Sequence, residues 1–184
     1  MATPTTLPAT FVAGNVLTAA QMNNLRGAFR VLQVVSTTKT DTFSATVAIG
    51  TTTALTGFTV TITPSSTSSK ILITYDALLI WGNTNYGMKA ILTRGGTAIA
   101  GATGDAAGNR TRISSLGQNG TQSFTFLDSP STTSATTYGL IIGHTNTNAA
   151  DSNVVYLNRY GTDTDSAQNG WRSASTITAM EISA

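Results

Sequence analysis

The sequence predicts an all-β protein, a jelly-roll-like antiparallel β-sandwich preceded by an extended arm and one short N-terminal helix. Short apolar stretches with a period of two are separated by clusters of Gly, Pro, Asn and Ser, the pattern of half-buried strands joined by turns. Threonine supplies about a fifth of the 184 residues, and its β-branched side chain suits a pleated sheet better than a helix. A chain of this length is expected to form one principal domain.

Residues 1–30 differ in character from the rest and are expected to form an arm, with the β-sandwich domain over residues 31–184. The opening MATPTTLPAT is extended, because each proline disfavours helical geometry at the residue before it. The segment Thr18–Gln21 then has the capping-box spacing that begins a helix, which we expect over about residues 19–29.

Four apolar side chains of this helical region are the candidate anchor. Leu17 and Met22 occupy the two positions of a hydrophobic staple, and Met22, Leu25 and Phe29 recur on one helical face. A helix of three turns is marginal in water unless its apolar stripe is buried. The stripe packs either on its own domain or on another subunit, and we favour docking on another subunit.

Ten strands are predicted from Val31 onward, and the Gly95-Gly96 pair between two of them is a tight hairpin signal. The predicted strands are Val31–Ser36, Thr42–Ile49, Gly57–Thr63, Lys70–Leu79, Gly87–Thr93, Thr97–Ala100, Gln122–Leu127, Tyr138–Ile142, Val154–Arg159 and Ser175–Ile182. The predicted interior consists of Ile71, Ile73, Tyr75, Leu78, Ile80, Met88, Ile91, Phe124, Phe126, Leu140, Ile142, Val155, Leu157, Ile177 and Ile182.

The composition argues against several classes of function. Only 10% of the residues are charged, the formal net charge is +2, and Arg110 with Arg112 is the only local basic grouping, so nucleic-acid binding has little support. The chain has no cysteine and therefore no disulfide or thiolate metal site. It shows neither a membrane-spanning apolar stretch nor a signal peptide, so we expect no membrane insertion and no classical secretion. A surface this poor in charge suits a protein that is covered by other subunits.

Residue types that carry catalysis are scarce. The single histidine, His144, has no partner that the sequence identifies, and we expect it on the surface or at an interface. The single glutamate, Glu181, should lie on the strand face opposite Ile182, as a solvent-facing or interface charge. A polysaccharide hydrolase would need a pair of carboxylates in a cleft, which makes an enzyme the least favoured hypothesis. We therefore predict a non-enzymatic protein.

Two loops deserve separate consideration as ligand sites. Asp163 and Asp165 supply too few oxygens for calcium and lack an EF-hand frame, so we expect them to form a turn and predict no metal site. The segment Gly104–Arg110 lacks the lysine and spacing of a phosphate loop and is expected to be a plain loop, with Asp105 and Arg110 as a candidate pair. No cofactor is expected.

Four aromatic residues near predicted strand ends are candidate contact residues. Exposed rings at such places stack on sugars or form the centres of protein interfaces. The sequence leaves open whether they contact a glycan, form an interface or belong to the core; these residues are Trp81, Tyr86, Tyr160 and Trp171.

Two sets of segments resemble known viral proteins. The opening PATFVAGNVLTAAQMNNLRGAF resembles the start of many virion proteins of tailed bacteriophages. SSKILITYDALL, YGMKAILTRGGTAIA, GDAAGNRTR, FTFLDSPSTTSATTYGL, VVYLNRYGTDTDS and STITAMEI are similar to fibre and appendage domains of aquatic phages. The resemblance implies a trimeric β-sandwich carried on the virion and implies no catalytic residue. The chain departs from long fibres because it has no shaft repeat.

The sequence therefore predicts a structural protein of a phage virion that is assembled in the host cytoplasm. The leading expectation is a homotrimeric capsid decoration or short fibre, whose arm binds other capsid or tail proteins. The alternative is a receptor-binding fibre tip that recognises host surface polysaccharide through its loop aromatics.

Overall fold

The computed structural model describes residues 31–82, 87–117, 119–144, 153–168 and 170–183, together with Gly14, Val16, Thr18, Ala19 and Met22. From Val31 onward the described part is built from strands and a single short 3-10 turn, Ala100–Ala102. Within it, no helix has the length and apolar character needed to cross a membrane.

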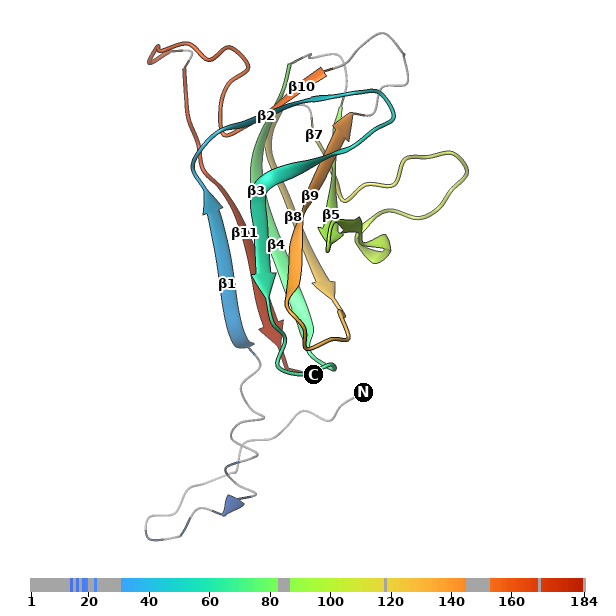
Figure 1. Cartoon of the computed structure of the whole chain (residues 1–184), viewed down its shortest axis with the longest axis vertical. Coiled ribbons are helices and arrows are strands. Elements are labelled where there is room, and N and C mark those ends of the chain that lie inside the picture. Colours follow the sequence, from blue (N-terminus) through green and yellow to red (C-terminus); the bar gives the residue numbers. More distant parts are fainter. Residues whose placement is uncertain are drawn as a thin grey trace.

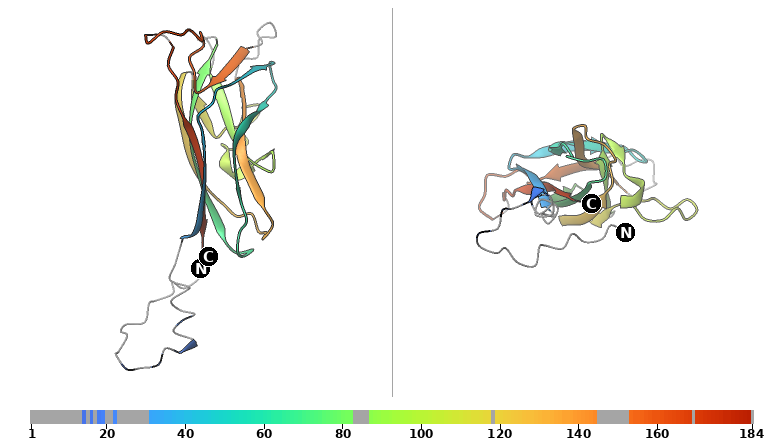
Figure 2. Two further views of the ribbon diagram at one scale, coloured as in Figure 1. Left: turned by 60° about the vertical axis from the view of Figure 1, so that its left-hand side comes forward. Right: turned by 90° about the horizontal axis from the view of Figure 1, so that it is seen from below.

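Strands β1 to β11 form two antiparallel sheets that pack face to face (Figures 1 and 2). Sheet A consists of β1 (Val31–Lys39), β11 (Ser175–Ile182), β4 (Lys70–Trp81), β8 (Asn119–Asp128), β10 (Asn153–Leu157) and β2 (Phe43–Val47). Sheet B consists of β3 (Thr53–Ile62), β9 (Thr136–His144), β5 (Met88–Arg94), β6 (Thr97–Ala98) and β7 (Ser115–Gly117).

The strand order is that of a jelly roll, which confirms the predicted fold class. Sheet A contains the order β1-β11-β4-β8, and sheet B contains β3-β9-β5-β7, so strands next to each other in a sheet are far apart in the chain. Two four-stranded sheets with this interleaving are the double Greek key of a jelly roll. Strands β10 and β2 extend sheet A beyond β11, because β11 pairs with the first part of β4 and β10 with its last three residues.

All ten predicted strands are present, and β7 was missed because three residues are too short to show a period. Strand β11 has the predicted bounds. The Gly95-Gly96 hairpin is also confirmed, since both glycines have positive φ, the geometry that a tight turn between β5 and β6 requires. Of the predicted helix, Ala19 and Met22 are helical, and the Met22 N–H donates to the Thr18 carbonyl at 3.0 Å. Leu17, Leu25 and Phe29 lie outside the described residues.

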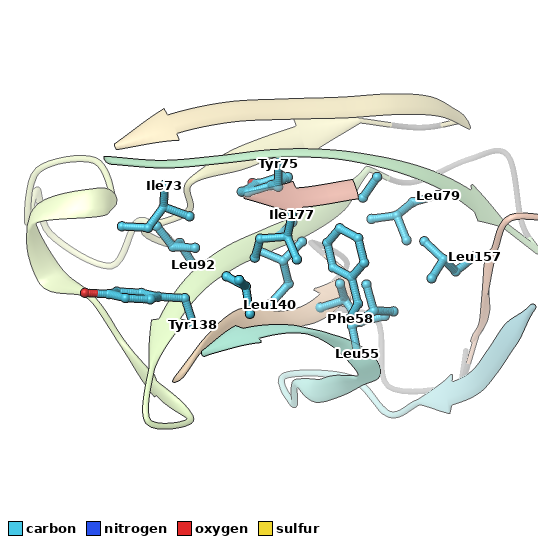
Figure 3. Close-up of a cluster of buried hydrophobic side chains, with 14 of the residues drawn as sticks. Leu55, Phe58, Ile73, Tyr75, Leu79, Leu92, Tyr138, Leu140, Leu157 and Ile177 are labelled. Atoms are coloured by element: carbon cyan, nitrogen blue, oxygen red, sulfur yellow. The ribbon is translucent and has the colours of Figure 1, made fainter. Parts of the chain in front are cut away.

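The core lies between the two sheets (Figure 3). Ile73, Tyr75, Leu79 and Ile177 of sheet A point toward Phe58, Leu92 and Leu140 of sheet B, and all are buried. These contacts join residues that are far apart in the sequence, so long loops of chain must close before the core can form.

Two details of the predicted interior are wrong in strand parity. Leu78 is only half-buried, and its neighbours Ala77 and Leu79 face the core. Ile182 is likewise half-buried, because the inward face of β11 is occupied by Ile177, Ala179 and Glu181. Alternation was read correctly in β11, but the side that faces the core was assigned to the wrong residue.

Candidate functional site

The outer face of sheet A presents an apolar row across four strands. Register pairing places opposite residues on the same face, so four side chains from β1, β11, β4 and β8 lie side by side. Val34 and Leu127, at the two ends of the row, are 55% and 52% exposed. The row consists of Val34, Met180, Leu72 and Leu127.

Two rows of hydroxyl-bearing side chains lie beside the apolar row. One consists of Ser36, Thr178, Thr74 and Thr125, and the next of Thr38, Thr176, Asp76 and Ser123. One pair in each row is hydrogen-bonded through its hydroxyls, Ser36 Oγ with Thr178 Oγ1 at 2.9 Å and Thr38 Oγ1 with Thr176 Oγ1 at 3.2 Å. Asp76 accepts a hydrogen bond from Ser123, so the single charge in these twelve positions has a partner. We call these three rows the sheet A face.

The sheet A face ends at an open strand edge. Strand β1 pairs with β11 on one side, and no second strand of the described chain pairs with its other side. Val31 and Leu32, at the start of β1, are also exposed, so apolar surface continues to the point where residues 1–30 join the sandwich. Exposed, apolar edge strands are surfaces on which other chains add.

Glu181 occupies a buried pocket at the same end of the sandwich, and the prediction of a solvent-facing charge is wrong. It is fully buried, because the turn at residues 64–69 folds over the end of β11. Its Oε1 accepts hydrogen bonds from the Ser65 N–H at 2.7 Å, the Ser65 hydroxyl at 2.6 Å and the Ser69 hydroxyl at 2.7 Å. Its Oε2 accepts one from Gln33 Nε2 at 2.6 Å.

These four hydrogen bonds take the place of water around the buried carboxylate, and all of them come from uncharged groups. Burial raises the pKa of Glu181, but the hydrogen bonds from Ser65, Gln33 and Ser69 outweigh burial and lower the pKa to about 2. Gln33 also donates to the Thr63 carbonyl at 2.7 Å. Glu181 therefore fastens β1 and the 64–69 turn to β11 and has a structural role.

A cluster of aromatic and charged side chains lies around the end of β10, and Figure 1 shows β10 at the end of the sandwich opposite the start of β1. The rings of Tyr160 and Trp171 are 5.9 Å apart between centroids, and their residues are 44% and 37% exposed. Arg159 lies 4.5 Å from the centroid of the Tyr156 ring. Asp163 forms ion pairs with Arg159, at 3.1 Å, and with Arg172. We call these six residues the distal cluster.

A depression of about 350 Å³ lies beside the distal cluster. Its lining includes Trp81, Asn119, Tyr156, Tyr160 and Thr162. Two glycines, Gly82 and Gly161, border the Tyr156 ring: a Cβ atom would lie 3.8 Å from Tyr156 Cε2 at Gly82 and 3.5 Å from it at Gly161. The small residues thus leave an edge of the ring uncovered.

The four candidate aromatics are placed differently. Tyr160 and Trp171 come together on the surface, which the sequence did not show. Trp81 is only 3% exposed, and its side chain belongs to the hydrophobic core. Tyr86 lies outside the described residues. Tyr156, Arg159 and Asn119 were not identified as site residues, and the only signal was the position of Tyr156 and Arg159 near the end of a predicted strand.

His144 is buried, which corrects the prediction of a surface or interface histidine. It is the last residue of β9 and packs against Trp81, with 5.5 Å between ring centroids. Arg110 donates to the Ala107 carbonyl at 3.1 Å, and the proposed pair with Asp105 is not among the ion pairs of the described chain. In the part of the chain that the structure describes, no three His, Cys, Asp or Glu side chains come together as a metal site.

Comparison with known proteins gives structural likeness alone. No family model matches the sequence, and no curated protein matches it. Similar solved structures include the infectious bursal disease virus VP2 subviral particle, with 15% identity and a TM-score of 0.35 over 82% of this chain and 41% of that one. They also include the infectious bursal disease virus Gx strain, with 18% identity and a TM-score of 0.34 over 81% of this chain and 37% of that one. The chain thus spans about two fifths of the length of these structures.

Proposed function

We propose that this chain is a non-enzymatic structural protein of a tailed-bacteriophage virion, a homotrimeric capsid decoration or short fibre that attaches through residues 1–30. The sheet A face is the observation that carries the proposal, because it is apolar in one row, uncharged in the next and continuous with the start of β1. The sequence resemblance of the opening segment to phage virion proteins supports the virion as its location. Jelly rolls serve in many virus coats, but also in unrelated proteins, so the fold alone would not decide.

The sheet A face has the chemistry of a protein interface. Interface centres are depleted of charge and enriched in apolar side chains, and the apolar row with its neighbouring hydroxyl row contains no charged residue. Complete burial of a valine or leucine contributes about 1.5–3 kcal/mol, so residues that are already half-buried, such as Val34 and Leu127, contribute about 1 kcal/mol each. Such modest contacts become effective when several copies act together with an anchored arm.

Three of the described carboxylates have contacts that support a structural role. Glu181 is enclosed by its hydrogen-bond donors, and Asp163 is held by two arginines. Asp128 pairs with Arg94 at 2.8 Å and accepts a hydrogen bond from Tyr138 at 2.8 Å, which joins the two sheets. Each of these groups already has a task in holding the fold.

Oligomer mass tests the interface. Leu127→Glu and Val34→Glu introduce a carboxylate that every symmetric contact would bury or oppose, so we expect trimers to dissociate to monomers in light scattering. Leu116→Glu is the matched control, because Leu116 is 58% exposed on β7, away from the sheet A face. A wild type that is monomeric, or a Leu127→Glu variant with the wild-type mass, would refute the interface.

Removal of residues 1–30 tests the anchor separately. The truncated chain should remain a folded oligomer and should not join virions when it is mixed with particles that lack the protein. Full occupancy of the particles by the truncated chain would show that the arm is not the attachment.

A second candidate function is recognition of a host surface polysaccharide. It is favoured by one observation, the aromatic depression beside the distal cluster. Its lining includes Tyr156 of β10, a strand that Figure 1 shows at the end of the sandwich opposite the start of β1. A protein fixed to the virion through its N-terminal segment would present that end outward.

A further inference from the structure

We infer that copies of this chain assemble by pairing strand β1 of one copy with strand β8 of the next, so that sheet A continues from copy to copy. The inference rests on the proposed self-association, and it names the strands and the register that form the contact. The occupant of the β1 edge is therefore a second copy of this chain. The contact is head to tail, because its two sides are different segments, and such contacts form closed rings when the rotation between copies allows it.

Sheet A has two edges that can accept a strand. Within the ranges that the structure describes, β1 pairs only with β11, and β8 pairs only with β4. The two strands have nine and ten residues, neither contains a proline, and their one lysine is Lys39 at the end of β1. The irregular pairing of β1 is confined to its start, between Val31 and Gln33. Proteins commonly protect edge strands by short length, proline, lysine or bulges, so these edges are open to strand addition.

The two edges run in the directions that an added copy requires. Strands β1, β11, β4 and β8 are each antiparallel to the next, so β1 and β8 run in opposite directions, as their arrows show in Figure 1. When two copies lie side by side with sheet A facing the same way, β1 of one copy meets β8 of the other antiparallel. Pairing of β1 with β1 of a second copy would instead give a two-fold dimer and leave both β8 edges unused.

One register continues the sheet A face across the contact. Partners in an antiparallel pair advance in opposite directions, so placing Val34 opposite Leu127 of the next copy determines every other pair. Val34 and Leu127 are the two ends of the apolar row, 55% and 52% exposed. The outer-face pairs are then Val34 with Leu127, Ser36 with Thr125 and Thr38 with Ser123. In this register apolar side chains meet apolar ones, and hydroxyls meet hydroxyls.

The same register also matches the inner faces of the two strands. Val35 of β1 and Phe124 and Phe126 of β8 pack against the core and are only partly buried. The pairing places Val35 opposite Phe126 of the next copy, and an aromatic residue opposite a β-branched one is a favourable cross-strand pair.

Other registers match less well. A slip of one residue would oppose outward-facing to inward-facing side chains. A slip of two residues would set Val34 opposite Thr125, or Leu127 opposite Ser36, and thus an apolar side chain against a hydroxyl. The proposed register is therefore the one in which the rows of both copies agree.

Engineered cysteines test the pairing, because the chain has none of its own. Within one copy, three strand spacings of about 4.8 Å separate β1 from β8, which exceeds the Cα separation of about 7 Å that a disulfide can bridge. Across the proposed contact, opposite Cα atoms would be about 4.5–5.5 Å apart. Ser36→Cys with Thr125→Cys in one chain should therefore give disulfide-linked dimers and trimers on a non-reducing gel after mild oxidation.

Matched variants check the strands and the register. Thr38→Cys with Ser123→Cys is a second pair in the same register and should crosslink as the first does. Ser36→Cys with Thr121→Cys shifts one cysteine by four residues, about 14 Å along β8, and should crosslink about tenfold more slowly or not at all. Neither Ser36→Cys nor Thr125→Cys alone should crosslink, whereas trimers assembled from a mixture of the two should give dimers only.

Light scattering on the wild type and on the reduced variants separates this inference from the proposed function. Oligomers whose matched pairs do not crosslink would overturn the pairing of β1 with β8 and leave the proposed oligomer standing. Crosslinking by a single-cysteine variant, or equal rates for the matched and shifted pairs, would overturn it as well. A monomeric wild type would refute the proposed oligomer, and the strand pairing with it.

Discussion

Replacing the single glutamate should remove a pH dependence of stability that the wild type shows. In Glu181→Gln the side chain keeps its shape, and the amide oxygen can still accept from Ser65 and Ser69. The amide NH₂ would then face Gln33 Nε2, which is itself a donor, so one contact becomes repulsive. We expect the variant to fold and to be less stable near neutral pH.

The magnitude follows from the pKa. A carboxylate that titrates at 4.5 when unfolded and at about 2 when folded contributes about 3 kcal/mol, since each pKa unit is worth about 1.4 kcal/mol. Because the folded pKa is the lower one, this stability is fully present above about pH 4.5. It is lost as the pH falls from 4.5 toward about 2, where the folded protein also takes up the proton.

Urea denaturation of both proteins at equal concentration, from pH 7 down to pH 2, measures the effect. The difference in unfolding free energy between wild type and Glu181→Gln should be about 2–3 kcal/mol at pH 7 and should shrink toward zero at the acid end. The seven aspartates are common to both proteins, so the difference isolates Glu181. A difference that stays constant with pH would refute the ionised, hydrogen-bonded carboxylate.

Two substitutions and one titration test the packing of the core and of the residues beside it. Leu79→Ala should cost about 2–5 kcal/mol of unfolding free energy, because the fully buried side chain leaves a cavity between the sheets, and chemical denaturation measures the loss. Gly143→Ala should lower the melting temperature in calorimetry, because its Cβ would lie 2.7 Å from both Lys89 Cε and the Thr51 carbonyl. In an alkaline absorbance titration Tyr75 should ionise late, since burial raises its pKa to about 12 although the Ser115 hydrogen bond lowers it. Tyr138 should ionise later still, since burial and the Asp128 carboxylate both raise its pKa.

The fold could be predicted from the sequence because its signals are local. Turn residues separate the strands, and β-branched residues with a period of two mark their faces, so strand positions were found without knowing which strands pair. The parity error at Leu78 arises where the run LLIW has no polar residue to mark the outward face. Alternation continued from Ile73 and Tyr75 would have placed Ala77 and Leu79 inside, but a small alanine gives a weaker signal than its neighbours.

Long-range contacts explain what could not be predicted of the sites. The sequence predicts an outward-facing charge at Glu181, because its hydrogen-bond donors Ser65 and Gln33 are 116 and 148 residues away in the chain and cannot be identified from local sequence. The distal cluster depends on a bridge between Arg159 and Arg172, which brings Trp171 to Tyr160. Nothing in a single strand or loop encodes either arrangement.

The hydroxyl rows of the sheet A face have a consequence for how such a protein would assemble. A fully apolar face would aggregate before it met its proper partners, whereas Ser36, Thr74 and Thr178 keep the face hydrated in the free chain. The Ser36 and Thr178 hydroxyls bond to each other within the sheet, so this hydrogen bond is kept when water leaves. In the proposed assembly the apolar row would supply attraction, and the hydroxyl rows would keep it weak enough for copies to separate and correct their register. A face of this kind needs a second attachment to give lasting assembly, and residues 1–30 lead directly into β1 at Val31.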